Sequence, residues 1–117
     1  MKREKLRVAV LGAGKWAEHA HLPGWIRDPR VEVVVLADVV RERAEELAAA
    51  LSIPEATTDW QAAVSRADVD VVDVVTPSHT HFELGMAALE SGKHVLCEKP
   101  VAYDYRETRR AADVARR

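Results

Sequence analysis

Residues 8–17 read VAVLGAGKWA, an aliphatic run that passes directly into two glycines separated by one residue. The apolar run begins at residue 6 and has the nearly continuous character of a strand buried on both faces. Gly12 would allow a tight turn out of that strand, and Ala17 would let the following helix pack closely against it. This stretch therefore predicts a strand, a glycine turn and a helix in succession.

Further apolar runs and helical patterns alternate along the rest of the chain. The runs rich in Val or other apolar residues predict strands at residues 31–38, 71–75 and 94–97. Between them, apolar side chains at spacings of three and four predict helices at residues 41–51 and 81–91. Strands that alternate with helices are typical of a parallel sheet whose crossovers carry the helices.

Two capping signals complete the outline of the chain. Asp59 predicts the N-cap of a short helix that extends to residue 64, and Asp104 with Glu107 fits a capping box for a last helix running to the C-terminus. The whole pattern predicts one doubly wound α/β domain over residues 1–117, with helices on both faces of a parallel sheet and right-handed crossovers.

The amino-acid composition limits the kinds of partner that we expect for this chain. The 117 residues are 48% hydrophobic and 31% charged, which suits one globular domain. Lys and Arg number 17 against 19 Asp and Glu, and this balance argues against a nucleic-acid or membrane surface. Cys97 is the only cysteine and no apolar stretch is long enough to span a bilayer, so we expect a cytoplasmic protein. No group of residues has the spacing of metal ligands, and no metal site is predicted.

The glycine turn is a candidate phosphate-binding site. In a doubly wound sheet, the first strand-to-helix turn receives the pyrophosphate of a dinucleotide. Gly14 would allow close approach of the backbone, and free N–H groups at the helix start would attract the negative charge. The candidate cofactor contacts in this stretch are Gly12, Ala13, Gly14, Lys15 and Trp16. A purely structural turn without a ligand is the alternative interpretation.

Asp38 ends the second predicted strand and is the candidate ribose ligand. A carboxylate there can accept hydrogen bonds from the adenosine ribose and repels a 2′-phosphate, which favours NAD over NADP. A cap for the following helix is the alternative role. Arg41 or Arg43 could reach a 2′-phosphate, although solvated helix surface is the simpler interpretation of both.

The second half of the chain resembles a known family. Residues 69–102, VDVVDVVTPSHTHFELGMAALESGKHVLCEKPVA, closely resemble the N-terminal domain of the glucose–fructose oxidoreductase / inositol dehydrogenase (Gfo/Idh/MocA) family. The matching pieces are Thr76-Pro77, His81, Ala88-Leu89, the GKHV segment at residues 92–95, Glu98-Lys99-Pro100 and the earlier His21-Leu22-Pro23. The resemblance covers essentially the whole chain, with two small departures at Ala17 and Ser78.

This resemblance implies an NAD(P)-dependent Rossmann-fold oxidoreductase that acts on CH–OH groups of a sugar or polyol, with NAD as the expected cofactor. It implies that Lys99 is catalytic, contacting the nicotinamide ribose and assisting proton transfer at the substrate hydroxyl. It also implies cofactor contacts from Thr76, Pro77, His81, Glu98, Lys99 and Pro100. Without the family, a surface ion pair would be the simpler interpretation of Glu98 and Lys99. His19 and His21 are expected only to pack or cap.

Family members are much longer, because a second domain shapes their substrate pocket. We therefore expect this chain to be the isolated dinucleotide-binding domain, inactive alone, with the substrate bound through the missing domain. A stand-alone dinucleotide-binding or redox-sensing module is the alternative. The predicted strand at residues 94–97 would lie at an open sheet edge, which favours a homo-oligomer.

Overall fold

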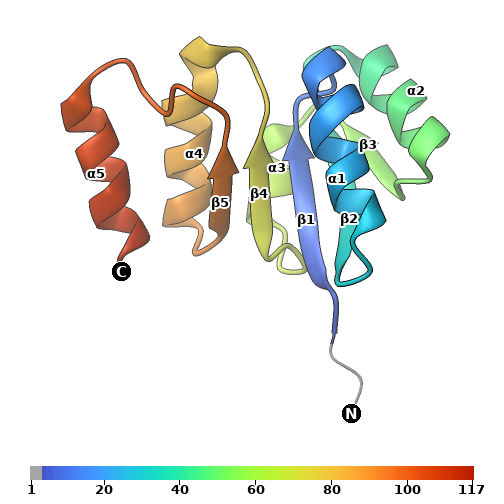
Figure 1. Ribbon diagram of the computed structural model, residues 1–117, viewed down its shortest axis with the longest axis horizontal. Coiled ribbons are helices and arrows are strands. Elements are labelled where there is room, and N and C mark those ends of the chain that lie inside the picture. The colour runs from blue at the N-terminus through green and yellow to red at the C-terminus, as the bar shows by residue number, and fades with distance from the viewer. Residues whose placement is uncertain (1–3) are drawn as a thin grey trace.

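Five parallel strands form one sheet in the order β3-β2-β1-β4-β5 (Figure 1). The computed structural model describes residues 4–117. The strands are β1 (Leu6–Leu11), β2 (Val31–Ala37), β3 (Glu55–Thr57), β4 (Val71–Val74) and β5 (His94–Cys97). The chain runs outward from β1 to β3 and then returns to the other side of β1, so the direction of the strand order reverses between β1 and β4. Ligands of open α/β sheets bind at such a switch point.

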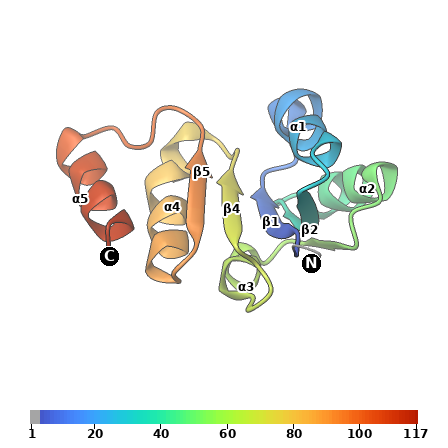
Figure 2. The same ribbon diagram turned by 60° about the horizontal axis from the view of Figure 1, so that its bottom comes forward.

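Helices cover both faces of this sheet, as predicted (Figure 2). They are a π-helical turn (Ala17–His21), α1 (Leu22–Arg27), α2 (Arg41–Leu51), α3 (Trp60–Ser65), a 3₁₀ turn (Ser78–Thr80), α4 (His81–Glu90) and α5 (Tyr105–Ala115). In Figure 2, α1 and α2 lie on one side of the sheet and α3 lies on the other. The doubly wound, three-layer α/β fold is therefore confirmed.

Each face of β1 contributes to a separate apolar core. Val8 and Val10 pack in the cluster that contains Leu22 of α1. Ala9 and Leu11 point to the opposite face, because side chains alternate along a strand, and they join a cluster that contains Leu84 of α4. This burial on both sides explains why the run is apolar at every position.

The helix after the glycine turn contains one wide turn that the sequence analysis did not predict. The N–H of Leu22 bonds to the carbonyl of Ala17, an i→i+5 bond that defines the π-helical turn. Pro23 follows immediately and has no N–H to bond back to the preceding turn. The wide turn accommodates this proline within a helical segment that ends at Arg27.

Most predicted boundaries are confirmed within one residue. The strands β2 and β4 each end one residue earlier than expected, and β5 matches its predicted bounds. The sequence analysis missed β3, which has three residues and pairs only with β2. A segment this short has too few positions to display a two-residue period.

The two predicted caps also hold. The Asp59 carboxylate accepts the N–H of Ala62 at the start of α3. Asp104 accepts the N–H of Arg106 at the start of α5. Glu107 donates its backbone N–H to the Asp104 carbonyl, but the hydrogen bonds of residues 4–117 include none from its side chain, so the capping box is only half formed.

At one edge of the sheet, β5 pairs only with β4, as the sequence analysis expected. α5 packs against α4 and buries none of its own residues (Figure 1). Pairing of this edge with a second chain stays a prediction. Within the described residues 4–117, no helix is both long and apolar enough to cross a membrane.

Candidate functional site

The predicted site residues gather at the carboxyl ends of the parallel strands. The glycine turn follows β1, Asp38 follows β2, Thr76 and Pro77 follow β4, and the segment from Glu98 to Pro100 follows β5. These ends lie along the upper edge of the sheet in Figure 1, where the arrowheads point. One edge of the sheet therefore carries every candidate residue.

Gly12 and Gly14 have different structural reasons to be glycine. Gly12 has φ +113°, and an added Cβ would lie 2.5 Å from the carbonyl oxygen of Val75, so the fold itself requires glycine there. At Gly14, an added Cβ would have no atom within 4 Å. The space beside Gly14 is open, which is the arrangement expected where a ligand approaches the backbone.

Several N–H groups of the glycine turn remain available to a ligand. The N–H of Gly12 donates to the Ala37 carbonyl, and that of Ala13 donates to Asp38 at 2.7 Å. The following N–H groups of Gly14, Lys15 and Trp16 have no hydrogen-bond partner within the described part of the chain. Free N–H groups at a helix start form a favourable environment for phosphate.

Asp38 holds the glycine turn and also faces the cofactor edge. Its Oδ2 accepts the Ala13 N–H, and its Oδ1 accepts the Val40 N–H at 2.8 Å. It is not the cap of α2, whose N-cap is Val40 without a side-chain bond. Each carboxylate oxygen can accept more than one hydrogen bond, so a ribose hydroxyl could still be bound.

A hollow of about 330 Å³ lies beside Asp38 and Thr76. Its walls are mainly apolar, and the lining residues are Leu11, Ala37, Asp38, Val39, Thr58, Trp60, Thr76, Pro77, His79, Thr80, Glu83 and Leu84. Sequence reasoning missed Trp60 and Val39 as parts of this site. Trp60 also packs against the core, whereas Val39 is 86% exposed and directly follows Asp38 in the chain.

A second hollow, of about 540 Å³, lies on the outer side of the glycine turn. Gly14 and Lys15 line it together with Arg43 of α2, while Glu18 and Glu46 contribute the opposite charge. Arg41, by contrast, lies 3.7 Å from Glu45. Of the two arginines considered for a 2′-phosphate, Arg43 is the one that shares a hollow with the turn.

His81 connects the ends of two strands. The residue is 2% exposed, and its ring nitrogens lie 2.8 Å from the carbonyl oxygen of Thr76 and 2.7 Å from that of Pro100. Thr76 is further fixed by the hydroxyl of Thr80, which donates to Oγ1 of Thr76 at 2.6 Å. Because both ring nitrogens of His81 are engaged with backbone, this residue acts on the site by holding the two strand ends together.

Glu98 is bonded to the helix that follows the glycine turn. Its Oε2 accepts the indole N–H of Trp16 at 2.7 Å and lies 2.6 Å from Nε2 of His21, while Oε1 accepts the Lys99 N–H at 3.3 Å. The hydrogen bonds from His21 and Trp16 lower the pKa of Glu98 to about 2. Lys99 itself is exposed. The partner of Glu98 is thus His21, and no ion pair of Glu98 with Lys99 occurs in the described residues.

Sequence reasoning missed the role of His21 and the presence of Asp73. Asp73 is fully buried in β4, and its carboxylate accepts the indole N–H of Trp25 at 2.7 Å and contacts Nδ1 of His21 at 2.7 Å. The expectation that His21 only packs or caps is wrong, because its ring bridges two carboxylates. The available signal was the charged residue in the middle of the apolar run VVDVV.

The environment shifts the pKa values of this pair. Burial raises the pKa of Asp73 above its ordinary value, although hydrogen bonds from Trp25 and His21 oppose the rise. Burial alone would lower the pKa of His21, but the hydrogen bonds and negative charges of Glu98 and Asp73 outweigh it and raise that pKa above 6.5. His21 therefore favours the charged ring.

Cys97 lies beside this group without taking part in its chemistry. The thiol is half-buried, and burial together with the charges of Asp73 and Glu98 raises its pKa to about 11. A thiol that resists ionisation is a poor nucleophile, in agreement with the structural role expected for Cys97. Among residues 4–117, no three His, Cys, Asp or Glu side chains are grouped to hold a metal ion.

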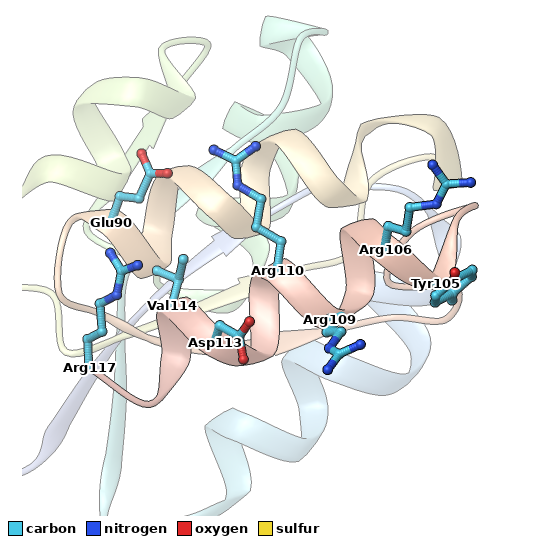
Figure 3. A pocket seen from close by; sticks show the side chains of 8 residues that line it. All are labelled: Glu90, Tyr105, Arg106, Arg109, Arg110, Asp113, Val114 and Arg117. Atoms are coloured by element: carbon cyan, nitrogen blue, oxygen red, sulfur yellow. The ribbon is translucent and has the colours of Figure 1, made fainter.

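A basic hollow of about 450 Å³ lies away from the strand ends, between α4 and α5. Figure 3 shows its lining residues, Glu90, Tyr105, Arg106, Arg109, Arg110, Asp113, Val114 and Arg117. The arginine side chains point in different directions instead of converging on one point (Figure 3). This surface lacks the geometry of a binding site, and the strand-end edge remains the candidate.

Comparisons with known proteins identify the family of this chain. The family profile described as "Oxidoreductase family, NAD-binding Rossmann fold" matches residues 6–117. Among curated proteins, D-glucoside 3-dehydrogenase of Escherichia coli K12 is 35% identical over 100% of this chain and 33% of its own length. Inositol 2-dehydrogenase of Mycolicibacterium gilvum is 42% identical over 95% of this chain and 33% of its own.

A solved structure shares the fold closely. A 3-ketoreductase from Actinomadura kijaniata, crystallised in complex with NADP, superposes with a TM-score of 0.91 and 34% identity. The match covers 97% of this chain and 36% of that one. The chain thus spans about a third of the length of these relatives.

Proposed function

The chain belongs to the Gfo/Idh/MocA oxidoreductase family, and from this we propose that it binds the dinucleotide of an enzyme that moves hydride between nicotinamide and a sugar or polyol hydroxyl. One observation carries the proposal. All the strand ends meet at one edge, where Gly14 and its neighbouring N–H groups face open space. A turn that served only the fold would not need a glycine at position 14.

The residues at this edge fit a dinucleotide. The N–H groups of Gly14, Lys15 and Trp16 would bind the pyrophosphate, and Asp38 would accept the ribose hydroxyls. The apolar hollow between Asp38 and Thr76 would receive the adenine ring. The ends of β4 and β5, which His81 holds together, would border the nicotinamide half. A bound nicotinamide supplies or accepts the hydride.

We assign proton transfer to Lys99. The resemblance implies that this lysine contacts the nicotinamide ribose and the substrate hydroxyl, and the exposed position of Lys99 just after β5 supports that assignment. Its ammonium group would hold or release the proton of the reacting hydroxyl while Glu98 keeps the turn in place. The sugar or polyol substrate would be enclosed by the part of the relatives that this chain does not span.

We further propose that NAD is preferred to NADP. The Asp38 carboxylate would lie next to the 2′ position, where its charge repels a phosphate. The solved 3-ketoreductase of Actinomadura kijaniata carries NADP, so the family does not decide the choice. The proposal rests on Asp38.

Calorimetric titration with NAD⁺ tests dinucleotide binding. We expect the wild-type chain to bind and Gly14→Val to bind at least about tenfold more weakly, because the new side chain would occupy the pyrophosphate position. Gly24→Val is the matched control, since Gly24 lies in α1 with open space around its Cβ position. Equal affinity of the Gly14→Val variant and the wild type would contradict the proposal.

A further inference from the structure

A continuous series of hydrogen bonds runs from the interior of the sheet to the candidate catalytic turn. Trp25 donates to Asp73, Asp73 contacts Nδ1 of His21, and Nε2 of His21 contacts Glu98. Glu98 also accepts from Trp16 and from the N–H of Lys99. The series joins three elements that are far apart in sequence, since 52 residues separate His21 from Asp73 and 77 separate it from Glu98.

When Asp73 and Glu98 are both ionised, the His21 ring carries two protons. Ionised carboxylates only accept hydrogen bonds, so each of the two ring nitrogens must donate. The nitrogens lie 2.7 Å from Asp73 and 2.6 Å from Glu98, which is the range of charge-assisted bonds. The raised pKa of His21 agrees with this doubly protonated form.

The two carboxylates that contact His21, Asp73 and Glu98, favour its charged form. Asp73 approaches from β4, and Glu98 follows β5, where the neighbouring thiol of Cys97 has a pKa raised to about 11. On the ring's own helical turn, Glu18 and His19 are exposed and lie 3.7 Å from each other. When His21 loses a proton, one of the two carboxylates therefore loses its imidazole donor.

The network spans both halves of the candidate site. Trp16 belongs to the helix start beside the glycine turn, where the pyrophosphate would be bound, and Glu98 precedes Lys99 at the nicotinamide end. Glu98 receives its two shortest bonds from Trp16 and His21 on that one helical segment. The Glu98 side chain thus links the Lys99 turn to that helical segment.

We propose that His21 is a positioning residue: its doubly protonated ring ties the Glu98–Lys99 turn to the glycine-turn helix, and dinucleotide affinity falls when the ring loses a proton. This inference rests on the proposed function of the same site. The ring itself contacts neither cofactor nor substrate, and it acts through Glu98. As the pH rises through the raised pKa of His21, the ring can donate to only one of the two carboxylates, so the tether weakens and the affinity decreases.

The pH dependence of NADH affinity tests the proposal in the full chain. We expect the wild-type dissociation constant to rise about three- to tenfold from acid to alkaline pH, the effect of losing one charge-assisted hydrogen bond. His21→Gln should bind weakly at every pH, because the amide has its N–H donors on one nitrogen and cannot replace two separate ring nitrogens. His19→Gln, an exposed histidine on the same turn, should retain the wild-type profile. Parallel profiles of the wild type and His21→Gln would overturn the proposal and leave the proposed function intact.

A second readout does not depend on the cofactor. Trp16 is 60% exposed, so its indole N–H is protected from solvent exchange mainly by the bond to Glu98. Nuclear magnetic resonance should show slow indole exchange at low pH and faster exchange as His21 titrates. Trp16→Phe identifies the resonance, and it should also weaken NADH binding, which keeps the test decisive if His21→Gln does not fold.

The two readouts separate the possible failures. If the wild type binds no dinucleotide at any pH, the proposed function is wrong, and the positioning role is judged on the Trp16 indole alone. The Trp16 indole could instead exchange with only the intrinsic pH dependence of a free indole and show no step where His21 titrates. That result would contradict the proposed positioning role. A purely structural His21 would lower the unfolding temperature of the variant without changing the pH profile of affinity.

Discussion

At the scale of single residues, Gly12 shows most directly how the fold restricts the sequence. Its φ of +113° and the 2.5 Å approach of the Val75 carbonyl leave no room for a side chain. Gly12→Ala should lower the free energy of unfolding by about 3 kcal/mol, since backbone strain and a clash with backbone act together. Urea unfolding measures this loss.

The control for Gly12 is another glycine. Gly24→Ala introduces the same methyl group into an open position of α1, where alanine should be neutral or stabilising by about 1 kcal/mol. Equal unfolding midpoints for Gly12→Ala and the wild type would mean that the turn can adopt another conformation.

Asp38 is the residue at which cofactor preference should be decided. Asp38→Ser removes the charge beside the 2′ position, so we expect the ratio of NAD⁺ to NADP⁺ affinity to fall about tenfold. Titration of both dinucleotides gives the ratio. Glu32→Ser makes the same change at an exposed position of β2 and should leave the ratio unaltered. Tighter binding of NADP⁺ than NAD⁺ by the wild type would show that Arg41 or Arg43 outweighs Asp38.

At the scale of elements, Lys93 ties the end of α3 to the start of β4. Its ammonium group donates to the Arg66 carbonyl at 2.6 Å and to the Val69 carbonyl at 2.8 Å, from a partly buried position. Hydrogen bonds from a charged donor are worth more than neutral ones, so Lys93→Met should cost about 2 kcal/mol of unfolding free energy. Denaturant unfolding compares it with Lys5→Met, a change at an exposed lysine. Equal losses in both variants would mean that Lys93 contributes nothing specific.

At the scale of the whole molecule, stability should depend on pH through the bridge between His21 and Glu98. The pKa of Glu98 is lowered from 4.5 to about 2. Its contribution to the free energy of unfolding is therefore complete above pH 4.5 and is lost as the pH falls towards 2. The pKa of His21 is raised from 6.5, so its contribution is complete below pH 6.5 and is lost as the pH rises through the raised value.

Variant differences isolate these two contributions. The free energy of unfolding of the wild type should exceed that of Glu98→Gln by about 2 kcal/mol near neutral pH. This difference should vanish near pH 2. The difference in unfolding free energy between the wild type and His21→Gln should shrink as the pH rises above the raised pKa of His21. Unfolding measured across pH provides both curves, and His94→Gln, at an exposed position of β5, is the control. A pH-independent difference for either variant would contradict the assigned bridge.

The sequence by itself determined the order of elements and the edge of the sheet that carries the candidate residues. Apolar runs, helical spacing and capping residues are local signals, and they specified β1, β2, β4, β5 and the main helices nearly to the residue. The resemblance carried by Thr76-Pro77 and Glu98-Lys99-Pro100 placed the family correctly. The roles given to the cofactor and catalytic residues stay predictions.

Only the tertiary structure decided which side chains meet. The strand order places β4 beside β1, which brings Asp73 under the helix that carries His21 and then brings Glu98 to the same ring. No local pattern encodes these contacts, because they depend on the pairing of strands far apart in sequence. The wide turn before Pro23 and the three-residue β3 were missed for a related reason: each is fixed by its neighbours in space, and its own residues carry too little signal.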